Sequence, residues 1–177
     1  VARWRRARQL TERSQREDAL KHALKCRANG TQPTLESIAG TLQISTGQAA
    51  DVLQELESHG LLSYEGEALL LKPAGLEMAL HIVRAHRLWE SYLAEQTGVS
   101  EAEWHRRAER QEHLLTPREA DALAAQLGHP RYDPHGDIIP ETPGDLVAEK
   151  GQPLQAVPAN TPVLITHIED EPETIYA

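Results

Sequence analysis

The sequence has one cysteine, no phenylalanine and no apolar run near the ~18 residues that cross a bilayer. Because Cys26 stands alone, an internal disulfide framework and a multi-cysteine zinc site are both excluded. No secretory signal opens the chain, and its first residue is Val1, so we expect a cytoplasmic protein that is either processed or part of a longer chain. Leucine, alanine, isoleucine and valine must therefore build the core, which suits packed helices.

Lysine and arginine are missing from residues 28–71, although six arginines lie within residues 1–16. That opening segment carries a charge of +5 in a chain whose net charge is −9. Such an arm can bind nucleic acid, lie on a membrane surface or form a solvated linker. Trp4 lies among the arginines, as aromatic and basic residues do at the cytoplasmic edge of a transmembrane helix. We therefore interpret residues 1–16 as a basic linker of the juxtamembrane kind.

The apolar pattern of residues 17–79 predicts three helices followed by a β-hairpin. Thr34 and Ser45 are suited to cap the second and third of these helices. Two short apolar strands within residues 61–71 enclose a turn that contains Gly66. Three helices and a hairpin in this order predict a winged helix-turn-helix domain.

A mainly helical segment is expected next, so the whole chain is predicted to be mainly α, of the α+β kind. A long helix should open at Pro73, and shorter helices should follow over about 101–115 and from Pro117. Capping boxes are predicted for both short helices, at Ser100–Glu103 and at Thr116–Glu119. Prolines then become frequent, and the apolar run at the end of the chain, residues 163–168, predicts loops and short strands.

One face of the helix expected over residues 101–115 carries four side chains that can bind metal. They are His105, Glu109, Glu112 and His113. At ~100° per residue these side chains fall in a single stripe. The preceding helix adds His86 and Glu90, which are also one turn apart. A single His–Glu pair is usually a solvated helix contact worth a few tenths of a kcal/mol, but six such groups on two neighbouring helices favour a metal site.

The ligand types narrow the choice of metal. Imidazole and carboxylate groups without thiolates suit Mn²⁺ and Fe²⁺ best, and Zn²⁺, Co²⁺ and Ni²⁺ also accept them. The sequence lacks a His-Glu-x-x-His motif, and Glu112-His113 does not replace it, so a zinc hydrolase is disfavoured. We expect a binding domain rather than an enzyme.

These features together resemble the diphtheria-toxin-repressor and manganese-regulator (DtxR/MntR) family. The resemblance covers residues 17–140 and rests on the winged helix, the motif of residues 85–90, the spacing of the histidines and glutamates, and the loop of residues 134–140. It implies a helical metal-binding and dimerisation domain over residues 80–140, and hence a homodimer. It also implies that residues 141–177 are part of an SH3-like (FeoA-like) segment.

The resemblance assigns the candidate ligands to two sites. The primary site would use Asp18, Glu109, Glu112 and His113, and the second site would use His86, Glu90 and His105. Glu109 stands where manganese-responsive members have glutamate and iron-responsive members have cysteine, so we expect Mn²⁺ first, then Fe²⁺ or Zn²⁺. Lys21 occupies the place of a second carboxylate in the manganese sensors, which disfavours a two-ion cluster at the primary site.

Charge favours one of the two functions that the resemblance implies. In a metal-dependent repressor, Ser45, Thr46 and Gln48 would contact bases, but Asp51 and Glu55 would then face phosphates. Without basic residues to neutralise phosphates, DNA is a disfavoured partner. Some bacterial manganese/zinc/iron ABC permeases resemble a membrane domain with a DtxR-like cytoplasmic tail. The sequence therefore favours a metal-sensing regulatory tail at the inner face of the membrane, with a permease in cis and an ABC ATPase as a further partner, over a free-standing repressor.

Overall fold

The computed structural model describes residues 2–146 and 152–166, which form two compact units. The first unit covers residues 1–83 and the second covers residues 84–177, and each is described by itself. Among the described residues, no helix has both the length and the apolar character needed to cross a membrane.

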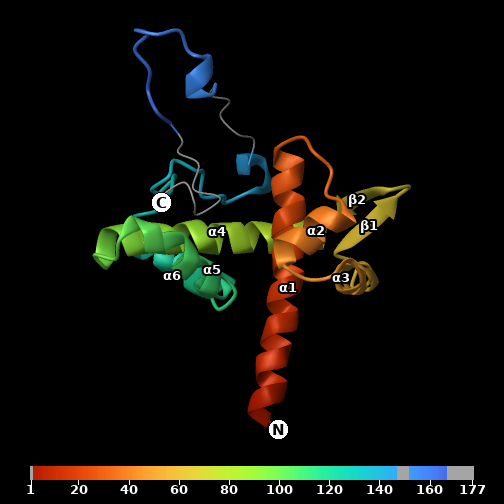
Figure 1. Cartoon of the computed structure of the whole chain (residues 1–177). Coiled ribbons are helices and arrows are strands. Elements are labelled where there is room, and N and C mark those ends of the chain that lie inside the picture. Colours follow the sequence, from red (N-terminus) through yellow and green to blue (C-terminus); the bar gives the residue numbers. More distant parts are fainter. Residues whose placement is uncertain (1, 147–151, 167–177) are drawn as a thin grey trace. The chain divides into compact units, whose positions relative to one another are not determined.

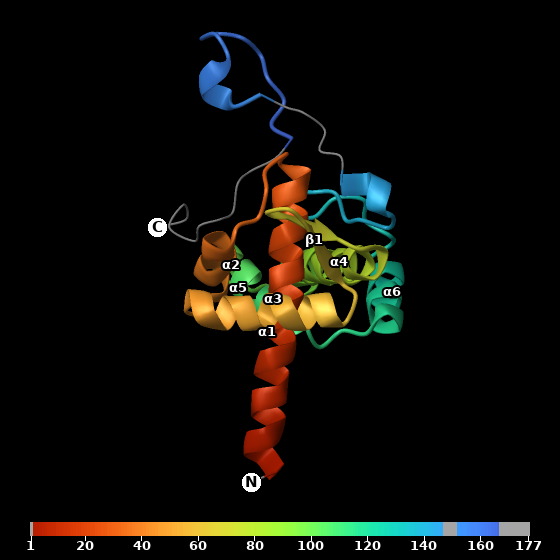
Figure 2. The ribbon, with the colours of Figure 1, turned by 90° about the vertical axis from the view of Figure 1, so that its right-hand side faces the viewer.

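The first unit contains three helices and a hairpin in the predicted order (Figure 1). Its elements are α1 (Ala2–Ala28), α2 (Leu35–Leu42), α3 (Thr46–Ser58), β1 (Leu62–Glu65) and β2 (Ala68–Leu71). Figure 2 shows α2 and α3 packed on the C-terminal half of α1. The buried aliphatic side chains that join them include Leu20, Leu24, Ile38, Leu53 and Leu56. The winged-helix prediction is confirmed.

Local sequence chemistry sets the ends of these elements. The Thr34 and Ser45 side chains accept hydrogen bonds from the backbone N–H groups of Ser37 and Gln48, as a cap requires. The antiparallel hairpin pairs Glu65 with Ala68, so the turn has only two residues. Gly66 occupies it with φ +63°, a conformation that glycine adopts without strain.

The first helix is longer than the sequence pattern indicated. It begins at Ala2, so the basic segment of residues 2–16 continues directly into the helix that packs in the core. No glycine or proline interrupts residues 2–28, and arginine, alanine and glutamine are good helix formers. Two arginines of this segment form ion pairs, Arg13 with Glu17 and Arg16 with Glu55 of α3.

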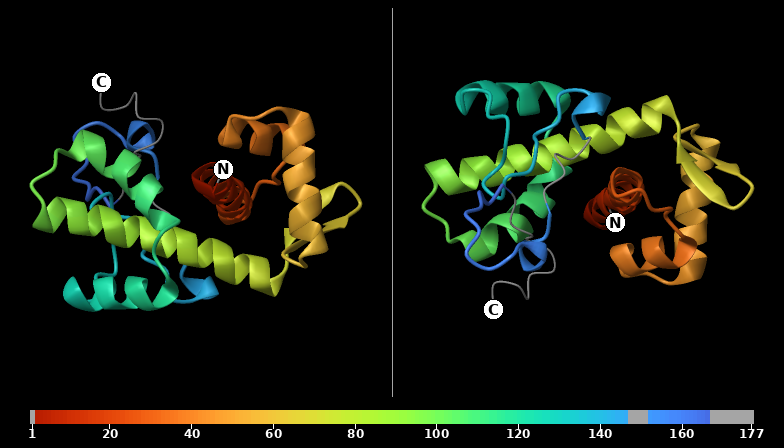
Figure 3. Two further views of the ribbon diagram at one scale, coloured as in Figure 1. Left: turned by 90° about the horizontal axis from the view of Figure 1, so that it is seen from below. Right: turned by 90° about the horizontal axis from the view of Figure 1, so that it is seen from above.

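The second unit is built on the C-terminal part of α4 (Pro73–Gln96), with α5 (Trp104–Glu112) and α6 (Pro117–Gln126) on its two sides (Figure 3). An apolar cluster joins α4 to α6 and to the loop that follows α6. It comprises Leu88, Ala120, Leu123, Ala124 and Ile139. The Thr116–Glu119 capping box is confirmed.

The helix predicted over residues 101–115 differs from the observed one. It starts with a 3₁₀ turn, Glu101–Glu103, and α5 ends at Glu112. The capping box predicted at Ser100 is wrong, because the Ser100 side chain makes no cap hydrogen bond. The Glu103 carboxylate instead pairs with Arg106 and Arg107 one turn further on, each at 3.0 Å.

The SH3-like segment expected over residues 141–177 is not confirmed. The described part contains two 3₁₀ turns, Pro143–Leu146 and Leu154–Ala156, and residues 152–166 contain no strand. The predicted strand at residues 163–168 is absent over residues 163–166, and its last two positions lie outside the described residues.

Two glycines within helices provide a matched test of packing in the first unit. A Cβ at Gly75 of α4 would lie 2.0 Å from the backbone oxygen of Leu61, whereas a Cβ at Gly40 of α2 would meet nothing within 4 Å. We expect Gly75→Ala to lower the free energy of unfolding by about 2 kcal/mol or more. We expect Gly40→Ala to raise it by about 0.5–1 kcal/mol, because alanine favours the helix. Urea denaturation measures both, and equal stability of the two variants would contradict the packing described here.

Candidate metal centre

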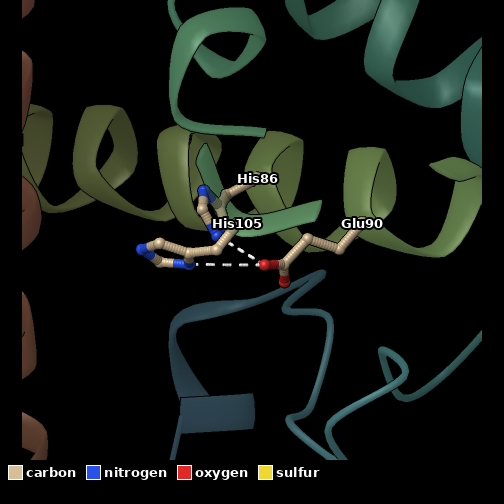
Figure 4. Close-up of side chains that lie close together, drawn as sticks. All are labelled: His86, Glu90 and His105. Atoms are coloured by element: carbon tan, nitrogen blue, oxygen red, sulfur yellow. Dashed lines mark ion pairs between the residues drawn. The ribbon is translucent and has the colours of Figure 1, made fainter. Parts of the chain in front are cut away.

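Two adjacent helices of the second unit bring His86, Glu90 and His105 together (Figure 4). His86 and Glu90 lie one turn apart on α4, and His105 lies on the first turn of α5. The Glu90 Oε1 atom is 3.1 Å from His86 Nε2 and 3.4 Å from His105 Nδ1. The three candidate ligand atoms lie within 4.8 Å of one another, so the set expected for the second site is a compact cluster.

Glu90 is the central group of this cluster and is almost wholly buried, with 1% of its surface exposed. Burial alone would raise its pKa, but contacts with His105, His135 and His86 outweigh burial and hold the pKa of Glu90 well below its usual range. The carboxylate is therefore ionised. Its Oε1 atom is buried and accepts no hydrogen bond of good geometry from the residues that the structure describes. A buried anionic oxygen in this state favours a cation beside it.

His86 links Glu90 to a second buried carboxylate. Its Nδ1 atom lies 2.5 Å from Glu112 Oε2, while its Nε2 atom faces Glu90. If His86 is neutral and its Nδ1–H donates to Glu112, the Nε2 lone pair points at the Glu90 oxygen, and two electron-rich atoms face each other at 3.1 Å. A metal ion between them would relieve this contact. A carboxylate that orients a histidine in this manner is the usual support of a metal-binding imidazole.

The α5 stripe does not converge on one point. His105 turns toward Glu90 and Glu112 toward His86, whereas the Glu109 side chain is 53% exposed. Glu109 Oε1 lies 3.5 Å from His105 Nε2, and Glu112 Oε1 lies 3.6 Å from His113 Nε2. All six candidate ligands of the second unit thus form one continuous chain of contacts. Asp18 belongs to α1 in the first unit, and its role stays a prediction.

The loop after α6, whose residues 134–140 carry part of the family resemblance, also reaches this cluster. Asp133 and His135, both buried, form a second group of potential ligands with Glu90. The His135 Nδ1 atom lies 3.8 Å from Glu90 Oε2, on the oxygen that does not face His86. The loop's sequence has an acid on each side of a histidine, Asp133 and Asp137, but no helical spacing that would place it beside Glu90.

Arg87 of α4 fixes this loop. Its guanidinium donates to the Ile138 carbonyl at 2.5 Å and contacts the Asp137 carboxylate at 3.3 Å and that of Asp133 at 3.7 Å. Within the loop, Asp133 Oδ1 accepts hydrogen bonds from the backbone N–H groups of His135 and Asp137, both at 2.9 Å. The position of Asp133 and His135 therefore depends on an arginine one turn before Glu90.

Burial raises the pKa of Asp133 to about 6. The charges of Asp137 and Glu90 add to this shift, whereas the backbone hydrogen bond from Asp137 and the charge of Arg87 oppose it. Several carboxylates thus share one buried region, a condition that a divalent cation would offset. The donor set contains only nitrogen and oxygen, which fits Mn²⁺, Fe²⁺ and Zn²⁺.

The residues named for base contact are exposed at the start of α3. Gln48 Oε1 accepts hydrogen bonds from the Ser45 backbone N–H at 3.1 Å and from the Ser45 hydroxyl at 2.9 Å. Two of the three, Ser45 and Gln48, are thus engaged in the helix cap, and Thr46 lies between them.

Comparison with known proteins places this site in a family context. Residues 72–141 match the family described as "Iron dependent repressor, metal binding and dimerisation domain". The match covers α4, α5, α6 and the loop with Asp133 and His135, which are the elements that carry the cluster.

Two kinds of relative share sequence with the chain. A "Probable metal transport system membrane protein" of Chlamydia trachomatis is 44% identical over 82 residues, which are 46% of this chain and 18% of that protein. The iron-dependent repressor IdeR of Mycobacterium leprae is 32% identical over 112 residues, which are 63% of this chain and 49% of that protein. The chain thus spans about half of the repressor and about a fifth of the membrane protein.

Solved structures are similar over both units. A manganese-dependent transcriptional repressor in complex with manganese has a TM-score of 0.66 and 32% identity, and the match covers 71% of this chain and 58% of that one. ScaR with bound Zn²⁺ has a TM-score of 0.66 and 30% identity over 77% of this chain and 64% of that one. A winged helix followed by a helical domain with clustered histidines and carboxylates defines the class of DtxR-like metal-sensing domains. The chain is thus similar to the iron-dependent repressor (DtxR/MntR) family, whose metal-binding and dimerisation domain matches residues 72–141.

The raised pKa of Asp133 predicts a pH dependence of stability in metal-free protein. In the folded state the pKa of Asp133 is about 6, above the ordinary 3.8. The contribution of protonated Asp133 to the free energy of unfolding is therefore fully present below the ordinary value and is lost as pH rises through 6. Asp133→Asn keeps the acceptor at Oδ1 and should remove this loss. Between pH 4 and 7 the unfolding free energy of the variant should gain about 2–3 kcal/mol relative to the unsubstituted protein. Urea melts in chelator measure it, and parallel pH profiles would contradict the assignment.

Proposed function

We propose that this chain is a divalent-metal sensing domain of metal-ion homeostasis that acts by binding rather than by catalysis. One observation carries the proposal: His86, Glu90 and His105 converge around a buried, ionised carboxylate oxygen that accepts no hydrogen bond within the described structure. In a structural ion pair one buried acidic group faces one basic group, whereas here two histidines, His86 and His105, face the same oxygen of Glu90. That arrangement fits an ion held by three side chains.

The primary site is proposed to use Asp18, Glu109, Glu112 and His113, following the family resemblance. Support comes from the second unit, where Glu109 and Glu112 contact His105 and His86 of the second site. A movement of a ligand residue at either site would therefore displace a residue of the other site. Mn²⁺ is the proposed metal, then Fe²⁺ or Zn²⁺, because the donors are nitrogen and oxygen and because similar proteins were solved with manganese and with zinc.

The setting that best fits the chain is a regulatory tail at the cytoplasmic face of a metal permease. The chlamydial relatives are named as metal transport membrane proteins, and the winged helix has no lysine or arginine over residues 28–71. In this setting the membrane permease lies in cis, an ABC ATPase is a further partner, and the helical domain forms a homodimer. The homodimer is supported by the word dimerisation in the family description. Metal occupancy would then report cytosolic metal to the transporter.

A stand-alone metal-dependent repressor is the second candidate, because the IdeR relatives and the structural neighbours are repressors. It requires α3 to enter the major groove with Ser45, Thr46 and Gln48 toward the bases. The acidic residues Asp51 and Glu57, exposed on the same helix, oppose that role.

Metal titration tests the site. We expect His105→Ala to weaken Mn²⁺ binding by 10-fold or more, since it removes a ligand. Binding should also weaken as pH falls through the histidine range, since protons compete for the imidazoles. Isothermal titration calorimetry measures both effects. His59→Ala, which changes an exposed histidine of the first unit, is the matched control and should bind as the unsubstituted protein does. Unchanged affinity in His105→Ala would refute the assignment.

DNA binding separates the two candidate settings. For a permease tail we expect no Mn²⁺-dependent gel shift with the promoter of a metal-uptake operon at ~0.15 M salt. A repressor would instead give a metal-dependent shift that weakens steeply as salt rises, because it releases counterions from phosphates. The charge-reversing substitutions Asp51→Lys and Glu57→Lys provide the control, because they should increase nonspecific DNA binding whichever setting is correct.

A further inference from the structure

We propose that the N-terminal end of α1 binds the anionic phospholipids of a membrane surface, while the acidic winged helix is held away from that surface. The inference rests on the proposed setting at the cytoplasmic face of a membrane and does not depend on the metal site. Two features of the first unit then have one explanation: the arginines at the start of α1 and the lack of basic residues over residues 28–71.

Positive charge is concentrated at the very start of α1. Residues 1–11 contain four basic residues and no acidic one. Further along the helix, Arg13 pairs with Glu17. Arg16 pairs with Glu55 of α3. The charge that a partner can use is therefore that of the first four arginines, which are Arg3, Arg5, Arg6 and Arg8.

These four positions surround the helix rather than line one face. The helix begins at Ala2, and at ~100° per residue the four positions are spread around its axis, at roughly 80°, 140°, 240° and 300°. A helix that lies flat on a membrane has its charged residues on one face and its apolar residues on the other. A ring of basic positions around a helix end suits end-on contact with headgroups. Trp4, in the same segment, is of a type enriched at membrane interfaces.

The rest of the first unit lies further along α1. Figures 1 and 2 show the N-terminal part of α1 extending beyond α2, α3 and the hairpin. Arg16, which pairs with Glu55 of α3, comes eight residues after Arg8 and so lies ~12 Å further along the helix axis. The Debye length at physiological salt is only ~8 Å. The charges of α3 are thus largely screened from a surface that contacts the end of α1.

The surface of the winged helix is repelled by anionic lipid. Residues 28–71 contain six acidic residues and no lysine or arginine. Asp51 and Glu57 are exposed on α3, and Glu65 and Glu67 are exposed on either side of the hairpin turn. If the first unit lay on its side, these carboxylates would approach the lipid phosphates within a Debye length. Attraction at the end of α1 and repulsion elsewhere therefore favour one orientation, with that end toward the membrane.

Nucleic acid also presents phosphates, but α3 disfavours it as the partner of the arginines. In DNA-binding domains a basic arm adds to the contacts of a helix in the major groove. Here that helix exposes Asp51 and Glu57, which would repel the same duplex. A membrane needs no contact beyond the end of α1, and the chlamydial relatives are named as membrane proteins.

The first experiment measures binding of the whole chain to vesicles by co-sedimentation, in chelator and ~0.15 M salt. We expect binding to phosphatidylglycerol and phosphatidylcholine in equal parts, and none to phosphatidylcholine alone. Replacing the first four arginines by glutamine should weaken binding by about 10-fold or more, because each adds attraction near the surface. The matched control replaces four exposed basic residues elsewhere and should bind as the unsubstituted chain does. Its substitutions are Arg27→Gln, Lys72→Gln, Arg110→Gln and Arg118→Gln.

Tryptophan fluorescence tests the orientation, because brominated lipids quench tryptophans that lie at the membrane. Added to the same vesicles, they should quench part of the emission, and Trp4→Phe should abolish that quenched part. Tyr64 is 43% exposed on the hairpin, so Tyr64→Trp places a reporter on the winged helix. We expect its added emission to stay unquenched, with circular dichroism confirming the fold of each variant.

The outcomes that overturn the inference are distinct from those that overturn the proposed function. Absence of vesicle binding, an equal loss in the control, or quenching of the Tyr64→Trp reporter would refute it and leave the metal site untouched. Tighter binding of duplex DNA than of vesicles at equal phosphate concentration, lost with the same four arginines, would make the segment a nucleic-acid arm. Unchanged Mn²⁺ affinity in His105→Ala would instead refute the metal site, with vesicle binding intact.

Discussion

The helical unit depends on how the charge of Glu90 is compensated in a buried position. An ionised carboxylate is costly to bury unless opposite charge or hydrogen-bond donors surround it. Here the surroundings come from three separate parts of the chain: His86 on the same helix, His105 on α5 and His135 in the loop after α6. The apolar cluster around Leu88 packs these parts together, but the carboxylate determines which side chains must meet.

His86 connects the cluster around Glu90 to the candidate ligands of the other site. Its two ring nitrogens face two different buried carboxylates, Glu90 and Glu112. An imidazole whose Nε2 binds an ion must carry its proton on Nδ1, and that proton is then donated to Glu112. Occupancy beside Glu90 would thus fix the hydrogen bonding of Glu112, whose other oxygen faces His113. This chain of contacts gives a physical route between the two sites that the family resemblance assigns.

The sequence predicted most of the features that depend on a few neighbouring residues. The caps at Thr34, Ser45 and Thr116 and the hairpin turn at Gly66 follow from residue chemistry within a few positions, and all are observed. The capping box at Ser100 failed because competing arginines one turn away bind Glu103. Helical spacing placed His86, Glu90 and His105 on neighbouring faces. It had no means of finding Asp133 and His135, since their position depends on the contact between Arg87 and Ile138, far apart in sequence.

The winged helix of the first unit does not by itself imply DNA binding. A fold carries no function by itself, and the chemistry of its surface decides what it binds. On this domain the helix that would enter the groove exposes Asp51 and Glu57, and Glu55 already holds Arg16 of the basic segment. A phosphate would have to displace that carboxylate to gain the arginine, so part of the positive charge in the segment is compensated within the chain. Metal chemistry in the helical unit, by contrast, has its donors buried, oriented and matched to N/O-binding ions.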